Sequence, residues 1–255
     1  MDDRTLEETV ALLRRSAVLR ACRDGPASRR TIAERADCSR STAYRATSEL
    51  TDEKLLERTN GGYRLTGSGA AALDHIRRFT DKLDGTDRIR PLFEYVDDPA
   101  FVRRAEFFTD AELVAQEASS PYHVENRMKT LIEGTEERMI GMTTGLGSPA
   151  LAQAMFERIR AGVCVEWMLP PETYEYFNTE HGELSAYGLE EGQTAVYVRT
   201  EPPVDLAIYD DTLVVFGFDR DRGVLDVVAI TEDGSAIRWA QERFEEYRGD
   251  AERVE

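Results

Sequence analysis

A run of polar side chains between Arg40 and Ser48 has the chemistry needed to bind a nucleic acid. Ser41, Tyr44, Arg45 and Ser48 follow an i, i+3, i+4, i+7 pattern that contains no aliphatic residue. Hydroxyls, a phenol and a guanidinium donate hydrogen bonds to base edges and phosphates, and Arg40 adds a positive donor close to the helix N-terminus. We therefore expect this run to contact DNA through Arg40, Ser41, Thr42, Tyr44, Arg45 and Ser48.

Two helices and a turn are expected to position this polar face. Ser39 is a favourable N-cap residue and predicts a helix that ends near Leu50. The opposite side of that helix carries small and apolar residues, Ala43, Thr47 and Leu50, which are suited to docking against Ile32, Ala33 and Ala36 of the preceding helix. Arg29 and Arg30, at the start of that preceding helix, are further candidates for DNA contacts.

A short β-hairpin is predicted directly after the second helix. The segments 56–59 and 63–65 are joined by Asn60-Gly61-Gly62, and Asn-Gly between alternating residues is a strong hairpin signal. Helix, turn, helix and hairpin in this order predict a winged helix-turn-helix, whose wing would grip the DNA backbone or minor groove through Arg58, Asn60 and Arg64. The alternative for the two helices alone is an ordinary helical hairpin packed in a core.

Charge is distributed unevenly along the chain. Residues 1–80 contain 15 basic and 12 acidic side chains, a net charge of +3, whereas residues 81–255 contain 17 and 37, a net charge of −20. Only the N-terminal part is therefore a plausible DNA-facing surface. Three lysines against 29 arginines, in an acidic chain of net charge −17, are typical of proteins from salt-accumulating halophiles.

The composition disfavours several other classes of protein. No stretch approaches the roughly 20 apolar residues of a membrane helix, and no secretory signal is apparent, so a cytoplasmic location is expected. Three cysteines without zinc-ligand spacing are interpreted as small buried hydrophobes, with a redox pair between Cys22 and Cys38 left open. The three histidines are scattered, and we expect neither a metal site nor a cofactor. The cysteines are Cys22, Cys38 and Cys164, and the histidines are His75, His123 and His181.

The remaining pattern predicts a second, α/β domain with a mixed sheet. A helix over 4–23 and another over 68–83 complete the first domain, and the boundaries are placed at 1–84 for the winged helix-turn-helix, 85–122 for a helical linker and 123–255 for the α/β domain. A strand at 138–142, a helix at 148–161 and a strand at 163–169 form a βαβ unit with a parallel pair. Antiparallel-looking strands follow at 194–198, 206–210, 212–218 and 224–230, and a final helix covers 235–248.

A glycine-rich segment lies at the βαβ junction. Gly145-Leu-Gly147-Ser-Pro-Ala150 matches G-x-G-x-x-A between a strand and a helix, with Glu166 on the next strand, and so superficially resembles a dinucleotide fingerprint. Pro149 inside the motif and the mid-strand position of Glu166 argue against that interpretation. Two alternatives stay open, an anion cradle at the helix N-terminus and a plain N-cap turn.

Several segments together resemble a family of archaeal winged-helix regulators that carry a methanogenesis-regulator type of middle domain, distantly similar to the sensor domain of TrmB-type regulators. The segments are Thr143-Thr144, 154–163, Leu169-Pro170, 202–217 and 239–248. The resemblance implies a one-component transcription regulator that is not an enzyme. Related phospholipase-D-like enzymes use an H-x-K motif, and none of the three histidines here is followed by that pattern.

Two functions from different classes remain open at this stage. The first is a homodimeric regulator of double-stranded DNA, with a dimer seam along Leu73, Ile76, Phe79 and Leu83, whose distal domain senses a small polar metabolite or a protein partner. The second is an enzyme or nucleotide-binding protein built on the distal domain, with an accessory DNA-binding module. The expected effector site consists of Thr143, Thr144, Gly145, Gly147, Ser148, Tyr209 and Phe216.

Overall fold

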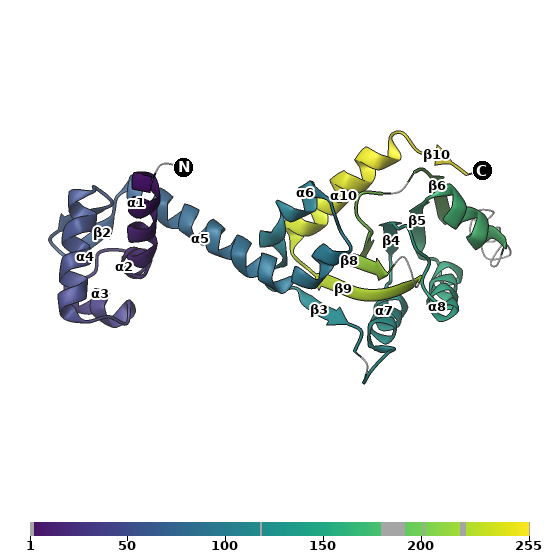
Figure 1. Cartoon of the computed structure of the whole chain (residues 1–255), viewed down its shortest axis with the longest axis horizontal. Helices are drawn as coiled ribbons and strands as arrows, with labels where there is room; N and C mark the ends of the chain where they lie inside the picture. The colour runs from purple at the N-terminus through teal and green to yellow at the C-terminus, as the bar shows by residue number, and fades with distance from the viewer. Residues whose placement is uncertain (1–2, 118, 180–191, 201, 220–222, 255) are drawn as a thin grey trace. The chain divides into compact units, whose positions relative to one another are not determined.

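The chain divides into two compact units, Met1–Asp81 and Lys82–Glu255, called here the N-terminal unit and the distal unit. The computed structural model describes residues 3–117, 119–179, 192–200, 202–219 and 223–254 (Figure 1). The segment 85–122, expected as a helical linker, belongs to the distal unit, because Ile89, Leu92, Phe101 and Phe108 are fully buried in its core. The boundary therefore lies three residues before the expected position, within a continuous helix.

The N-terminal unit has the predicted winged helix-turn-helix arrangement. Its elements are α1 (Asp3–Arg14), α2 (Ser16–Ala21), α3 (Arg29–Arg35), α4 (Arg40–Asp52), β1 (Leu56–Thr59), β2 (Gly62–Leu65) and the first part of α5 (Gly67–Arg88). The single helix expected over 4–23 is two helices, interrupted at Arg15. The Arg15 guanidinium donates to the Ala11 carbonyl and pairs with Glu53 at 2.8 Å, which ties the break to the end of α4.

Local signals account for the geometry of this unit. The Ser39 hydroxyl accepts a hydrogen bond from the Thr42 backbone N–H at 3.1 Å and so caps α4. In the hairpin, Tyr63 exchanges two backbone hydrogen bonds of 2.9 Å with Ala27, just before α3. A Cβ at Gly62 would lie 2.2 Å from the Ala27 carbonyl oxygen, so this position requires glycine. The wing is thereby fixed to the helix-turn-helix.

The distal unit is built on one mixed sheet of eight described strands. They are β3 (Glu112–Ala115), β4 (Arg138–Met142), β5 (Cys164–Leu169), β6 (Thr194–Val198), β7 (Leu206–Tyr209), β8 (Thr212–Asp219), β9 (Val224–Thr231) and β10 (Glu252–Arg253). Their order across the sheet is β10-β6-β5-β4-β7-β8-β9-β3. The expected parallel pair β4–β5 is present, but β6 is also parallel to β5, which corrects the antiparallel expectation for that strand.

Helices cover both faces of this sheet (Figure 1). One face packs against η1 (Arg90–Glu94), α6 (Pro99–Val102), η2 (Ala105–Phe108) and α10 (Gly234–Arg248), and the other against α7 (His123–Gly134) and α8 (Pro149–Arg160). Residues 171–179 are also helical. Side chains of β8 alternate between the two cores, with Val215 in the first and Val214 and Phe216 in the second. The result is a three-layer α/β/α unit whose central strands are buried on both faces.

Candidate nucleic-acid interface and distal pocket

The outer face of α4 presents the side chains that the sequence singled out. Ser41, Tyr44 and Arg45 are exposed, Tyr44 to 57%, and Ser48 is half-buried, whereas Ala43, Thr47 and Leu50 are fully buried on the opposite side. Arg40 and Arg45 form no ion pair with any residue that the structure describes. Two guanidinium groups on this face are therefore available to a phosphate or a base edge.

Hydroxyl groups surround the N-terminus of α4. The Ser39 Oγ lies 2.8 Å from both the Ser41 Oγ and the Thr42 Oγ1, so these two side chains turn toward the cap. The first turn of a helix has unpaired N–H groups and the positive end of the helix dipole, and both favour an anion. A phosphate placed here would meet hydroxyl donors and the Arg40 side chain together.

Arg29, expected to contact DNA, has a different environment from Arg40 and Arg45. Its guanidinium carbon lies 4.1 Å from the ring centroid of Tyr44 and 5.1 Å from that of Tyr63, and its Nε donates to the Thr47 hydroxyl at 3.2 Å. Arg29 thus connects α3, α4 and the wing, and it holds the exposed Tyr44 ring in place. Its neighbour Arg30 is exposed and pairs with Glu34 at 3.0 Å.

The wing carries one unpaired arginine and one paired arginine. Arg58 and Asn60 are exposed, and Arg58 has no ion-pair partner among the described residues. The Nε of Arg64 lies 2.5 Å from Glu57, directly across the hairpin. Arg58 is therefore the stronger phosphate donor of the two, because a phosphate must compete with Glu57 for Arg64.

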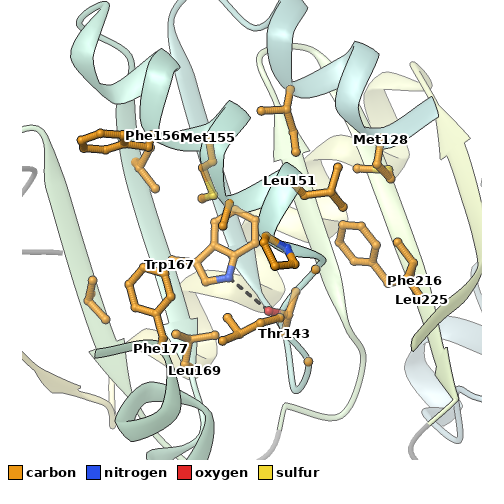
Figure 2. A pocket seen from close by; sticks show the side chains of 18 of the residues that line it. Met128, Thr143, Leu151, Met155, Phe156, Trp167, Leu169, Phe177, Phe216 and Leu225 are labelled. Carbon is orange, nitrogen blue, oxygen red and sulfur yellow. Dashed lines mark hydrogen bonds between the residues drawn. The ribbon is translucent and has the colours of Figure 1, made fainter. Parts of the chain in front are cut away.

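A cavity of about 160 Å³ lies between α7, α8, the helical residues 171–179 and the adjacent face of the sheet. Figure 2 shows Trp167 in its middle, with Met155 of α8 on one side and Phe177 on another. Five of the seven residues expected at an effector site line this cavity. They are Thr143, Gly145, Gly147, Tyr209 and Phe216. These five residues are thus close in space, around a pocket with mainly apolar walls.

The expected anion cradle is contradicted by the hydrogen bonds at this loop. The backbone N–H and the hydroxyl of Thr144 both donate to the Asp205 carboxylate, and the Ser148 hydroxyl donates to Glu125. Ser148 also caps α8 by accepting from the Leu151 backbone N–H. The donors proposed for a ligand anion already bind carboxylates of the protein itself, which would repel a second negative charge. The plain N-cap interpretation is the one that the geometry favours.

A second, more open hollow beside the same loop also disfavours anions. Its volume is about 780 Å³, and Thr144, Ser148 and three carboxylate residues, Glu125, Glu172 and Asp219, are among the residues that line it.

The glycines of the apparent dinucleotide fingerprint are explained by packing. A Cβ at Gly145 would lie 2.8 Å from the Phe218 ring, and a Cβ at Gly147 would lie 2.8 Å from a methyl group of Leu151. Glu166, the acidic residue of the apparent fingerprint, pairs with Arg248 at 3.0 Å. Small residues are needed here because side chains approach the loop closely, which gives the glycines a role that involves no dinucleotide.

Most residues that line the pocket escaped the sequence prediction, among them Met155, Trp167, Phe177 and Thr194. For Trp167 the sequence did contain a signal. Gly141 lies inside a strand that is buried from Met139 onward, and glycine at such a position often marks a close approach. A Cβ at Gly141 would lie 2.7 Å from the Trp167 indole, which therefore packs closely against β4.

The cysteines agree only in part with the expectation of buried hydrophobes. Cys22 is buried, and burial raises the pKa of its thiol to about 11 although Arg35 opposes the shift. Cys38 is half-buried, and Cys164, the first residue of β5, is exposed, which corrects the expectation for that residue. Among the described residues, which exclude His181, no cluster of histidine, cysteine and acidic side chains is arranged for a metal. In the same part of the chain, no helix is long and apolar enough to span a membrane.

Residues 121–250 match the family model of the methanogenesis regulatory protein FilR1, middle domain, and residues 3–88 match that of the HVO_A0261 N-terminal domain. The chain belongs to the FilR1 middle-domain family. The curated methanogenesis regulatory protein FilR1 of Methanothrix harundinacea (strain 6Ac) is 26% identical over 220 residues, which cover 81% of this chain and 48% of that protein. The chain thus spans about half the length of this relative.

One similar solved structure is that of TrmBL2, described as an archaeal chromatin protein. It is 15% identical in sequence, the match covers 89% of this chain and 88% of that chain, and the TM-score is 0.46. Another is that of Nuc from Salmonella typhimurium, a phospholipase D family member. It is 12% identical in sequence, the match covers 56% of this chain and 98% of that chain, and the TM-score is 0.44.

Proposed function

We propose that the protein is a transcription regulator that binds double-stranded DNA through α4 and the β1–β2 wing. In this proposal the distal unit is not an enzyme and senses a small molecule or a protein partner. The main support is the outer face of α4. Arg40 and Arg45 are exposed there, close to the hydroxyls of Ser39, Ser41 and Thr42, and neither arginine has an ion-pair partner among the described residues. Membership of a family named for a regulatory protein supports it.

A comparison of matched arginine variants tests the DNA-binding face. A binding site is first selected from a random double-stranded library with the full chain, and affinities are then measured by fluorescence anisotropy. We expect the Arg40→Ala/Arg45→Ala variant to bind the selected site at least tenfold more weakly, since one good contact to a base is worth about 1–3 kcal/mol. The control, Arg77→Ala/Arg78→Ala on α5, loses the same charge but removes arginines that pair with Asp74.

An equal loss of DNA affinity in both variants would show that only net charge matters, and it would contradict a specific role for α4. Unchanged binding by the Arg40→Ala/Arg45→Ala variant would exclude this face altogether.

The proposal includes a homodimer, because a single winged helix contacts a short site and two-fold operators need two copies. The expected seam on α5 is divided in the structure. Leu73 and Ile76 pack against the core of the N-terminal unit, whereas Phe79 and Leu83 are 49% and 50% exposed. The exposed pair supports a contact with a second copy.

Light scattering tests the dimer. We expect the parent protein to be a dimer at micromolar concentration and the Phe79→Ser/Leu83→Ser variant to be a monomer. A monomeric parent protein would refute the homodimer.

A further inference from the structure

We infer that the distal pocket binds a compact, uncharged aromatic molecule that carries one hydroxyl or carbonyl group. The regulatory consequence of this binding rests on the function proposed above, but the binding itself does not. Nothing in the sequence pattern indicated such a ligand, because the glycines and hydroxyls of the 143–148 loop suggested a polar or anionic one.

The volume and walls of the pocket set the size and the apolar character of the ligand. An apolar cavity of about 150 Å³ in a protein interior holds one benzene molecule, and the volume here is about 160 Å³. Trp167, Phe177 and Phe216 present aromatic surfaces, and Met128 and Met155 add flexible thioethers (Figure 2). Aromatic rings and methionine sulfur both interact favourably with an aromatic guest.

Two hydroxyl groups in the pocket wall have hydrogen-bonding capacity to spare. The Thr194 Oγ1 is buried and has no hydrogen-bond partner among the described residues. The Thr143 Oγ1 accepts from the Trp167 Nε1 at 3.1 Å, so its own proton remains free for an acceptor. A buried polar group without a partner costs about 1–3 kcal/mol, and a ligand hydroxyl or carbonyl would remove that cost.

Charge is excluded from this ligand. No arginine, lysine, aspartate or glutamate is among the described residues that line the pocket. An ionised group would lose its hydration without gaining a counter-charge. A sugar would bury several hydroxyls mainly against aliphatic and aromatic side chains, because only four of the described lining residues carry a hydroxyl, namely Thr143, Thr194, Tyr176 and Tyr209. An uncharged ring with one polar group satisfies the size, the surface and the hydrogen bonds together.

Trp167 provides a direct signal for binding. The chain has two tryptophans, and Trp239 lies in the core on the other side of the sheet. In a Trp239→Phe variant, all tryptophan emission therefore comes from Trp167 in the pocket. The full chain with this substitution is titrated with p-cresol, toluene, benzoate and glucose, and binding is followed by tryptophan emission and by calorimetry. We expect p-cresol to bind several-fold more tightly than toluene, benzoate at least tenfold more weakly than p-cresol, and glucose not at all.

Matched variants locate the site. Ala152 lines the pocket and Ala150 is exposed two residues earlier on α8, outside its lining. Ala152→Leu should abolish p-cresol binding, and Ala150→Leu should leave it unchanged. Thr194→Val keeps the shape of the side chain but removes the hydroxyl, so it should bring the affinities for p-cresol and toluene together. Absence of p-cresol binding at millimolar concentration, or equal binding to Ala152→Leu and Ala150→Leu, would overturn the inference.

Ligand binding and DNA binding are measured separately. DNA affinity for the selected site is measured with and without p-cresol. Pocket-dependent binding of p-cresol in a chain that binds no DNA would support the ligand class and refute the regulator. DNA binding that depends on α4, in a chain that ignores all four probes, would support the regulator and refute the ligand class.

Discussion

Asp210 is a single residue that joins two parts of the distal sheet. Its carboxylate accepts hydrogen bonds from three successive backbone N–H groups at the start of β4, those of Glu136, Glu137 and Arg138, at 2.7, 2.9 and 2.9 Å. Its own backbone has a φ of 49°, which aspartate and asparagine tolerate better than most residues. Burial alone would raise the pKa of this carboxyl, but the three N–H donors outweigh it and lower the pKa.

We predict that Asp210→Asn lowers the free energy of unfolding by about 1–3 kcal/mol at pH 7, because charge-assisted hydrogen bonds to backbone are lost while the positive φ is still tolerated. The stabilisation by Asp210 is fully present above the unfolded-state pKa near 3.9 and disappears as the pH falls through the lower folded-state pKa. The difference between variant and parent in urea unfolding should therefore shrink below about pH 4. Asp211→Asn, an exposed neighbour, is the control, and an equal loss there would contradict the role of Asp210.

Arg29 offers a second test with a single residue. Because its guanidinium stacks on Tyr44 and Tyr63 and bonds Thr47, we predict that Arg29→Ala destabilises the N-terminal unit by about 1–2 kcal/mol and also weakens DNA binding. Arg29→Lys should restore little of either, since an ammonium cannot stack as a planar group. Arg30→Ala is the matched control. A variant with normal thermal stability and weaker DNA binding would show that Arg29 is a direct DNA contact and not a positioning residue.

Among the elements, those specified by neighbouring residues were predictable from the sequence. The start of α4 follows from Ser39, and the wing follows from the Asn60-Gly61 turn, because caps and turns act within a few residues. The strand β3 was not predictable, since four residues, Glu112–Ala115, form an edge strand only by pairing with β9, more than 100 positions away. The direction of β6 likewise depends on β5 and not on its own sequence.

The distal site shows the same limit. The sequence analysis placed Thr143, Gly145 and Tyr209 at one site, and all three line the pocket. The sequence analysis did not foresee that the hydroxyls of Thr144 and Ser148 are already bound within the protein. Their partners are Asp205 and Glu125, which are 61 and 23 positions distant along the chain. Which donors remain available to a ligand depends on such tertiary contacts.

The wing yields a prediction about two arginines on one hairpin. Each phosphate contact contributes about 0.9 to the slope of log affinity against log salt. We predict that Arg58→Ala lowers the slope by about one unit on specific and nonspecific DNA alike. Arg64→Ala should change it less, because Glu57 already neutralises that side chain. Binding of the selected site and of an unrelated duplex is measured between about 0.1 and 0.5 M salt. A larger effect of Arg64→Ala than of Arg58→Ala would contradict the assignment.

Over the whole molecule, charge is divided between the first third of the chain and the rest. Residues 1–80 carry a net charge of +3 and residues 81–255 one of −20, so we expect DNA to approach the first segment and to be repelled by the second. We propose that the acidic composition is an adaptation to high salt, where phosphate contacts weaken and bidentate arginine contacts to bases carry more of the affinity. Arginine, the dominant basic residue here, is suited to that requirement.

Site-specific photocrosslinking tests the central claim, that the N-terminal unit binds DNA through α4, most directly. The photoreactive residue p-benzoylphenylalanine is placed singly at Tyr44, Tyr122 or Tyr176, which are 57%, 67% and 61% exposed and are matched in chemistry. After irradiation with the selected DNA, we predict a crosslink from position 44 and none from positions 122 and 176 of the distal unit. Crosslinks from position 122 or 176, with none from position 44, would contradict it.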